Sequence, residues 1–154
     1  MRSWARTLAA GAAGGALATV TMSGVMWAAG SAGLMGRQPP RRITDEAADA
    51  ADADDADERE LDAAAAAAHL AFGSAMGVAY TAMDRLVRPP LPPAVVGAGF
   101  GLALWGISYG GVIPALGIMP PPPKDRDDRQ TSMVAAHLVY GVTLARFVRT
   151  WVTR

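Results

Sequence analysis

The chain has 154 residues, and its 14 lysines and arginines balance its 14 aspartates and glutamates, so the net charge is zero. Cysteine is absent, which excludes disulfides, thiolate nucleophiles and cysteine metal sites. The charges are clustered, and four segments carry no Lys, Arg, Asp or Glu: residues 7–36, 63–83, 91–123 and 130–145.

The four uncharged segments predict four membrane-spanning helices. A bilayer core takes about 20 mostly apolar residues, and a soluble helix would need a polar face that these segments lack. We expect spans at about residues 8–34, 63–83, 94–119 and 131–148, the last continuing past Arg146, whose side chain extends to the headgroups. The predicted fold is all-α: one integral membrane four-helix bundle over residues 1–154.

Small residues at four-residue spacing recur in the spans and allow helices in lipid to approach closely. The glycine pairs are Gly11 with Gly15, Gly73 with Gly77, Gly97 with Gly101, and Gly106 with Gly110. Together they predict a compact bundle.

The first span begins after Arg2 and Arg6, and this pattern also occurs in cleaved signal peptides. We reject that alternative because the segment has a counterpart later in the chain. The acidic outer loop, residues 37–62, follows. It is rich in alanine, so we expect a helix here, capped by Thr44, that projects from the membrane and can continue into the second span.

The aspartates of residues 52–57 raise the alternative of a calcium site. The run lacks the glycine turn and the closing glutamate of an EF-hand loop. A solvated helical face is therefore the favoured interpretation.

An internal repeat organises the chain. Residues 67–73 reappear as residues 135–141, which places the only two histidines, His69 and His137, 68 residues apart. Residues 33–35 match residues 117–119 at an offset of 84, and 84 − 68 = 16 is the length of the acidic stretch at residues 45–60. We therefore expect two tandem hairpins, related by an axis along the membrane normal and forming an up-down-up-down bundle, with the acidic insertion in the first.

The third span follows a proline-rich connection and contains Pro114. This proline should kink the helix or leave a free carbonyl near Tyr109 and Gly110. Tyr109, Trp105 and Ser108 form a patch with polar tips, which either lines the bundle interior or contributes to packing.

Orientation is predicted from charge. With the N-terminus inside, seven basic residues lie on each side of the membrane, seven arginines inside and six arginines with Lys124 outside, so the positive-inside count is a tie. The inside arginines are Arg2, Arg6, Arg85, Arg88, Arg146, Arg149 and Arg154. Thirteen of the 14 acidic residues then lie outside and only Asp84 inside, which favours cytoplasmic N- and C-termini.

His69 and His137 are the candidate cofactor-binding residues. Each lies about six residues, or about 9 Å, from the outer end of its span. Ionisable residues within a membrane are costly, which indicates function. The pair can ligate haem iron axially or serve a proton or ion pathway; alternatively, each imidazole bridges neighbouring helices. No catalytic or metal residues are identified, since neither histidine has Asp, Glu or Cys three or four residues away.

The motifs around these histidines, Ala-His-Leu-x-Phe-Gly and Ala-His-Leu-Val-Tyr-Gly, together with Gly-Ile-Met-Pro-Pro, resemble the uncharacterised YagU-like family of bacterial inner-membrane proteins. The resemblance covers most of residues 8–148. It implies a four-span inner-membrane protein and supplies no catalytic residues. The acidic insertion departs from the family pattern.

The leading functional hypothesis is a non-enzymatic protein of the inner membrane that acts through packing or through partners in the bilayer, including a second copy of itself. The competing hypothesis is a bis-histidine haem protein or a proton or ion pathway. No nucleic-acid partner is expected, because no motif or basic patch for one is present.

Overall fold

The computed structural model describes residues 3–51, 57–87 and 89–153, which form helices and turns but no strand. Most of the candidate calcium-binding run, and Arg2, Arg88 and Arg154 of the orientation argument, lie outside these residues. The elements are α1 (Trp4–Ser31), α2 (Pro39–Ala50), α3 (Glu58–Val87), α4 (Pro93–Ile107), a π-helical turn η1 (Ser108–Val112), α5 (Ile113–Ala115), a 3₁₀ turn η2 (Pro122–Lys124) and α6 (Asp127–Thr153).

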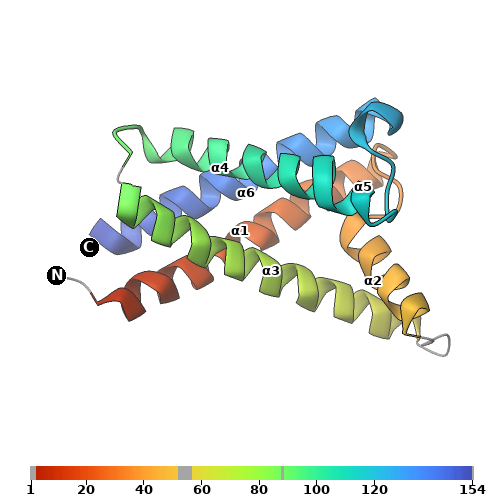
Figure 1. Cartoon of the computed structure of the whole chain (residues 1–154), viewed down its shortest axis with the longest axis horizontal. Helices are drawn as coiled ribbons and strands as arrows, with labels where there is room; N and C mark the ends of the chain where they lie inside the picture. The colour runs from red at the N-terminus through yellow and green to blue at the C-terminus, as the bar shows by residue number, and fades with distance from the viewer. Residues whose placement is uncertain (1–2, 52–56, 88, 154) are drawn as a thin grey trace.

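Four helices are long and apolar enough to cross a membrane: α1, α3, the continuous stretch Pro93–Ala115 and α6. The predicted all-α four-helix bundle is confirmed. Both termini lie at one end of the bundle, here called the terminal end (Figure 1). The opposite end carries α2 and the loop between α5 and α6, and is called the α2 end.

Helices α1 and α3 are in backbone contact through glycine. A Cβ on Gly15 would overlap the Gly73 carbonyl oxygen, and a Cβ on Gly77 would overlap the Gly11 carbonyl oxygen. Two helix backbones can approach this closely only where the residues in contact lack a side chain, as expected for pairs of small residues in apolar helices. Figure 1 shows α1 and α3 crossing and then separating toward the α2 end.

The second hairpin repeats this contact between α4 and α6. A Cβ on Gly97 would overlap the Gly141 carbonyl oxygen, and one on Gly101 would overlap that of His137. The remaining predicted pair behaves differently, because nothing lies within 4 Å of a Cβ placed on Gly106 or Gly110. Three of the four small pairs therefore bring helices together.

The first and third spans end with the same backbone geometry, as the repeat predicts. Gly33 and Gly117 both have φ +76°, in the left-handed region that favours glycine. In the first helix Leu34 N–H donates to the Ala29 carbonyl at 2.9 Å, and in the second Ile118 N–H donates to the Ile113 carbonyl at 3.2 Å. These are Schellman motifs, and they end the helices three to four residues before the expected limits of the spans.

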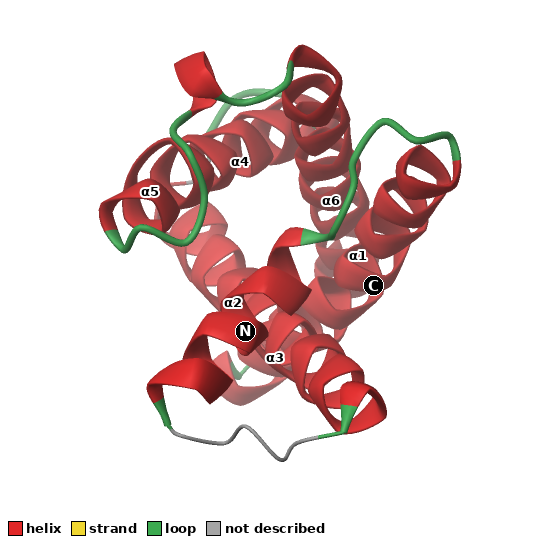
Figure 2. Cartoon of the chain, turned by 90° about the vertical axis from the view of Figure 1, so that its right-hand side faces the viewer, coloured by secondary structure: helices red, strands yellow, loops and turns green. Residues whose placement is uncertain are grey.

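The two sides between the hairpins are not equivalent. The repeat relates α1 to α4 and α3 to α6, so a symmetric bundle would pack α3 on α4 as tightly as α1 on α6. Helix α1 does pack along α6, but α3 and α4 have no comparable contact. Tyr80 and Phe100 join them, with ring centroids 5.2 Å apart. Figure 2, viewed from the α2 end, shows the ribbons of the helices arranged in a ring.

Helix α2 differs from the predicted acidic helix. It begins at Pro39, with Gln38 as N-cap, because proline is favoured in the first turn of a helix. Thr44 is therefore inside the helix, where its hydroxyl donates to the Pro40 carbonyl at 3.0 Å, and the expectation that Thr44 is the cap was wrong. The helix packs against α3 rather than projecting freely, and it ends at Ala50 instead of continuing into that span.

Candidate functional site

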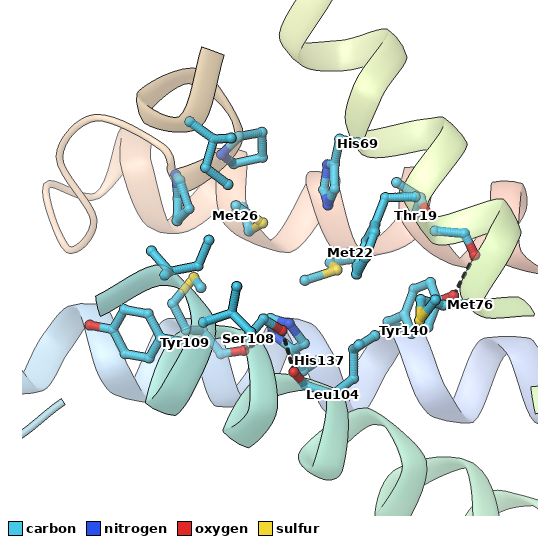
Figure 3. Close-up of a pocket in the computed structure, with 18 of the residues that line it drawn as sticks. Thr19, Met22, Met26, His69, Met76, Leu104, Ser108, Tyr109, His137 and Tyr140 are labelled. Atoms are coloured by element: carbon cyan, nitrogen blue, oxygen red, sulfur yellow. Dashed lines mark hydrogen bonds between the residues drawn. The ribbon is translucent and has the colours of Figure 1, made fainter. Parts of the chain in front are cut away.

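An apolar cavity of about 440 Å³ lies inside the bundle toward the α2 end. Both histidines line it, from opposite helices (Figure 3). Its walls come from α1 to α6, the turn η1 and the loop after α5. They consist of Thr19, Met22, Met26, Pro39, Pro40, Ile43, His69, Phe72, Gly73, Met76, Leu104, Ile107, Ser108, Tyr109, Val112, Ile113, Met119, Met133, His137 and Tyr140. Its volume lies within the usual range of about 300–1,000 Å³ for sites that bind small molecules.

His137 is held in one orientation and one tautomer. The residue is 7% exposed, and its Nδ1 lies 2.8 Å from the Met133 carbonyl oxygen. Because a carbonyl oxygen can only accept, Nδ1 carries the proton and donates it in this hydrogen bond. The other nitrogen, Nε2, therefore has a lone pair that can bind a metal or accept a hydrogen bond.

His69 is half-buried and has a similar but weaker contact. Its Nδ1 lies 3.5 Å from the Ser23 hydroxyl on α1. A hydroxyl can donate or accept, so this contact is compatible with the tautomer of His137. In both histidines the protein contacts Nδ1, and no described contact occupies Nε2.

The glycine contacts explain why the histidines share one cavity. Gly73 follows His69 by four residues, and Gly141 follows His137 by four, so each histidine lies one turn from a helix crossing. Helical side chains tilt toward the N-terminus, which for α3 and α6 is the α2 end. Each imidazole therefore projects into the space that opens beyond the crossing. The repeat predicted that both histidines lie at the same depth in their spans, and the structure adds the cavity that they share.

The sequence did not indicate that methionines would form much of the wall. Five methionines line the cavity: Met22, Met26, Met76, Met119 and Met133. Among them only Met119 belonged to a recognised motif, the one shared by the ends of the first and third spans. Methionine is flexible and polarisable, and it adapts to the shape of an apolar partner.

Three hydroxyl groups of the wall donate to backbone carbonyls. Thr19 donates to the Gly15 carbonyl at 2.8 Å, and Tyr140 donates to the Gly73 carbonyl at 2.6 Å. Ser108 donates to the Leu104 carbonyl. These hydroxyls have used their protons, and the two Nε2 atoms carry lone pairs that no described contact occupies.

The predicted patch of Tyr109, Trp105 and Ser108 is divided by the structure. Ser108 and Tyr109 line the cavity, whereas Trp105 packs against Tyr109 with ring centroids 5.9 Å apart and is not part of the wall. In the turn before Pro114, Ile113 N–H donates to the Ser108 carbonyl five residues earlier, which makes this turn π-helical. This π-helical turn lies where the sequence predicts a kink or a free carbonyl.

Tyr109 also connects the wall to a charged network at the α2 end. Its hydroxyl donates to Asp125, which forms an ion pair with Arg129. Burial alone would raise the pKa of Asp125. The hydrogen bonds from Tyr109 and the Arg126 N–H, with the charge of Arg129, outweigh burial and lower that pKa below its ordinary value.

Arg41 forms a second network, between α2 and α3. Its guanidinium contacts Asp45 at 2.7 Å, Glu58 at 2.8 Å, and Asp62. The hydrogen bonds to Asp45 and Asp62, with that to Glu58, raise the pKa of Arg41 above its ordinary value. These contacts hold α2 against α3, beside the cavity residues Pro39, Pro40 and Ile43.

Comparison with protein-family models, with curated proteins and with solved structures finds no match to the chain. Within residues 3–51, 57–87 and 89–153, no three His, Cys, Asp or Glu side chains are grouped to hold a metal ion. The site is thus defined by its own geometry: an apolar cavity between helices with two imidazole nitrogens available inside it.

Proposed function

We propose that the chain is a non-enzymatic, multi-pass protein of the bacterial inner membrane that binds an apolar ligand from the bilayer in the cavity. The observation that carries this proposal is the shared cavity of His69 and His137. A bundle used for packing alone is expected to close around its polar side chains, since voids lose contacts and destabilise a core.

The outer surface of the helices supports the membrane location. Large apolar side chains point away from the bundle, and Val20, Trp27 and Ile107 are 61%, 70% and 65% exposed. A protein in water rarely exposes so many apolar side chains on long helices. The resemblance of the histidine motifs to inner-membrane proteins supports the same compartment.

The open side between α3 and α4 supports access from lipid. Ile107 and Val112 lie at the cavity wall and are also 65% and 51% exposed, so they border the opening. A ligand dissolved in the acyl chains can therefore reach the cavity without crossing the headgroups. The wall would hold it by apolar contact, and the imidazoles would recognise its polar centre.

Photolabelling tests the proposal. The full chain is placed in phospholipid vesicles that contain a fatty acid with a diazirine on its chain, irradiated, and mapped by mass spectrometry. We expect adducts on Met22 or Met133, which are 6% and 5% exposed and line the cavity. Adducts confined to outward-facing residues such as Leu102 would overturn the proposal.

A matched pair of variants locates the access route. Val112→Trp places a bulky ring at the opening and should reduce adducts on Met22 and Met133. Val95→Trp makes the same change at a residue of similar exposure, 54% against 51%, away from the cavity, and should leave them unchanged.

A further inference from the structure

We infer that the ligand of the cavity is a haem whose iron takes His69 and His137 as its two axial ligands. This inference rests on the proposed function, because it names the class of molecule that the cavity binds. It is argued from the donor atoms, the number of ligands, the volume and the charges around the cavity.

The donor atoms have the state that iron requires. A histidine ligand offers one nitrogen lone pair and usually donates its other N–H to a carbonyl or carboxylate, which fixes the ring. His137 has this arrangement, with Nδ1–H on the Met133 carbonyl at 2.8 Å. His69 can form the same arrangement if its Nδ1–H donates to the Ser23 hydroxyl, which lies 3.5 Å from Nδ1. Two dative bonds to iron would form from Nε2 lone pairs, and neither imidazole would lose a proton.

The number of protein ligands fits a metal ion that is already coordinated by a porphyrin ring. Two protein ligands do not complete a tetrahedral or octahedral site, and no third His, Cys, Asp or Glu joins the pair in the described residues. Haem supplies four equatorial nitrogens and needs two axial ligands. The cavity provides two histidines, on opposite helices related by the internal repeat.

The volume and the walls agree with a large apolar ring. Thioethers are soft ligands that favour copper(I), so the methionines also raise the possibility of a bare copper ion. A cavity of about 440 Å³ is far larger than a single ion needs. Phe72, Tyr109 and Tyr140 contribute rings to the wall, and porphyrin binds well to aromatic and thioether groups.

Arginines lie in a second pocket at the α2 end. This pocket of about 230 Å³ is lined by Arg37, which pairs with Asp45 at 3.1 Å, and by Arg42, together with Glu46 and Ile118. Arg42 adjoins Ile43, and Ile118 adjoins Met119, and both of these neighbours line the main cavity. A ring with its carboxylates at this end would place them near arginine.

The test is a titration of the detergent-purified full chain with ferric protoporphyrin IX, followed by optical absorption. We expect one haem per chain, a sharp Soret band, and the split α and β bands of low-spin iron after reduction by dithionite. His69→Ala and His137→Ala should each lose the low-spin spectrum, and added imidazole should restore it because the substitution leaves room for it.

Two further variants separate coordination from folding. Ser23→Ala removes the contact to His69 Nδ1 and should weaken haem binding by roughly tenfold while keeping the low-spin bands, because a group that orients a metal ligand typically contributes that much to affinity. Val95→Trp should bind haem normally. This result would show that a substitution in a membrane span does not by itself prevent folding.

The outcomes distinguish this inference from the proposed function. Absence of a low-spin spectrum in the unaltered chain, or a spectrum that survives both histidine substitutions, overturns haem. If photolabelling of Met22 or Met133 is nevertheless observed, the cavity binds a different apolar molecule and the proposed function stands. Copper retained by the histidines without a porphyrin would overturn haem as well, and loss of both signals would overturn both proposals.

Discussion

Arg129 and Asp125 form an ion pair across one turn at the α2 end, with Arg129 Nη1 3.1 Å from Asp125 Oδ1. The two side chains are only 11% and 4% exposed. Arg129 Nε also donates to the Met35 carbonyl at 2.9 Å, and Met35 follows the end of α1. One arginine therefore joins the first hairpin to the loop of the second.

Replacing Asp125 by asparagine should destabilise the protein substantially. The change leaves the Arg129 charge buried without its carboxylate, and breaking a buried pair in this way typically costs about 3–5 kcal/mol. Urea unfolding in detergent measures the effect. Asp128→Asn is the control, because Asp128 is 60% exposed and its contact with Arg126 is 3.7 Å long, so its loss should cost about 1 kcal/mol or less.

The stabilisation by Asp125 should depend on pH. Its pKa is lower in the folded state than in the unfolded chain, so the carboxylate contributes stability above the unfolded value, and this contribution disappears as the pH falls through the folded value. The difference in Tm between the unaltered chain and Asp125→Asn should therefore be largest near pH 7 and should narrow below about pH 4. A difference that stays constant down to pH 3 would contradict the assignment.

Alanine at Gly141 should destabilise the bundle. Its Cβ would overlap the Gly97 carbonyl oxygen, which forces α4 and α6 apart at a cost of about 1–3 kcal/mol. Gly99→Ala is the matched control, because open space surrounds that position and alanine is the better helix former. Thermal unfolding in detergent should show a lower Tm for the first variant only. Equal effects would mean that the glycine crossing does not hold these helices.

Cysteine labelling should establish the orientation, since the chain has no cysteine of its own. With cytoplasmic termini, Asp49→Cys at the α2 end should react with a membrane-impermeant maleimide on spheroplasts. Leu91→Cys at the terminal end, 55% exposed, should react only after permeabilisation. The reverse pattern would invert the predicted orientation, and equal labelling of both would contradict a membrane-spanning chain.

The repeat made much of the architecture predictable, because one motif carries several constraints. The matching of residues 33–35 with residues 117–119 corresponds to two identical Schellman ends, and the matching histidines correspond to one shared cavity. The expected ends of the first and third spans, residues 34 and 119, lie beyond the ends of the helices. They were placed by apolarity, and Leu34 and Met119 are apolar although Gly33 and Gly117 have already ended the helices.

Other features depend on tertiary contacts that local sequence does not encode. Gly106 and Gly110 have the same spacing as Gly97 and Gly101, yet only the latter pair meets a neighbouring helix. The five methionines of the wall lie within the expected spans. Which faces of these helices surround a cavity depends on how far α3 and α4 separate, and the sequence does not indicate that separation. The start of α2 at Pro39 could have been predicted from the sequence, because prolines such as Pro39 and Pro40 are typical of a first helical turn.

Helix α2 belongs to one hairpin only, so a nearly two-fold molecule has two chemically distinct sides. Helices α1 and α6 pack together on one side, whereas α3 and α4 have no comparable contact on the other. Residues 45–50 of α2 belong to the 16-residue insertion, so the first hairpin carries a helix at the α2 end where the second has the 3₁₀ turn η2. Under the proposed function, a ligand in the cavity therefore meets two chemically different sides and should take one preferred orientation.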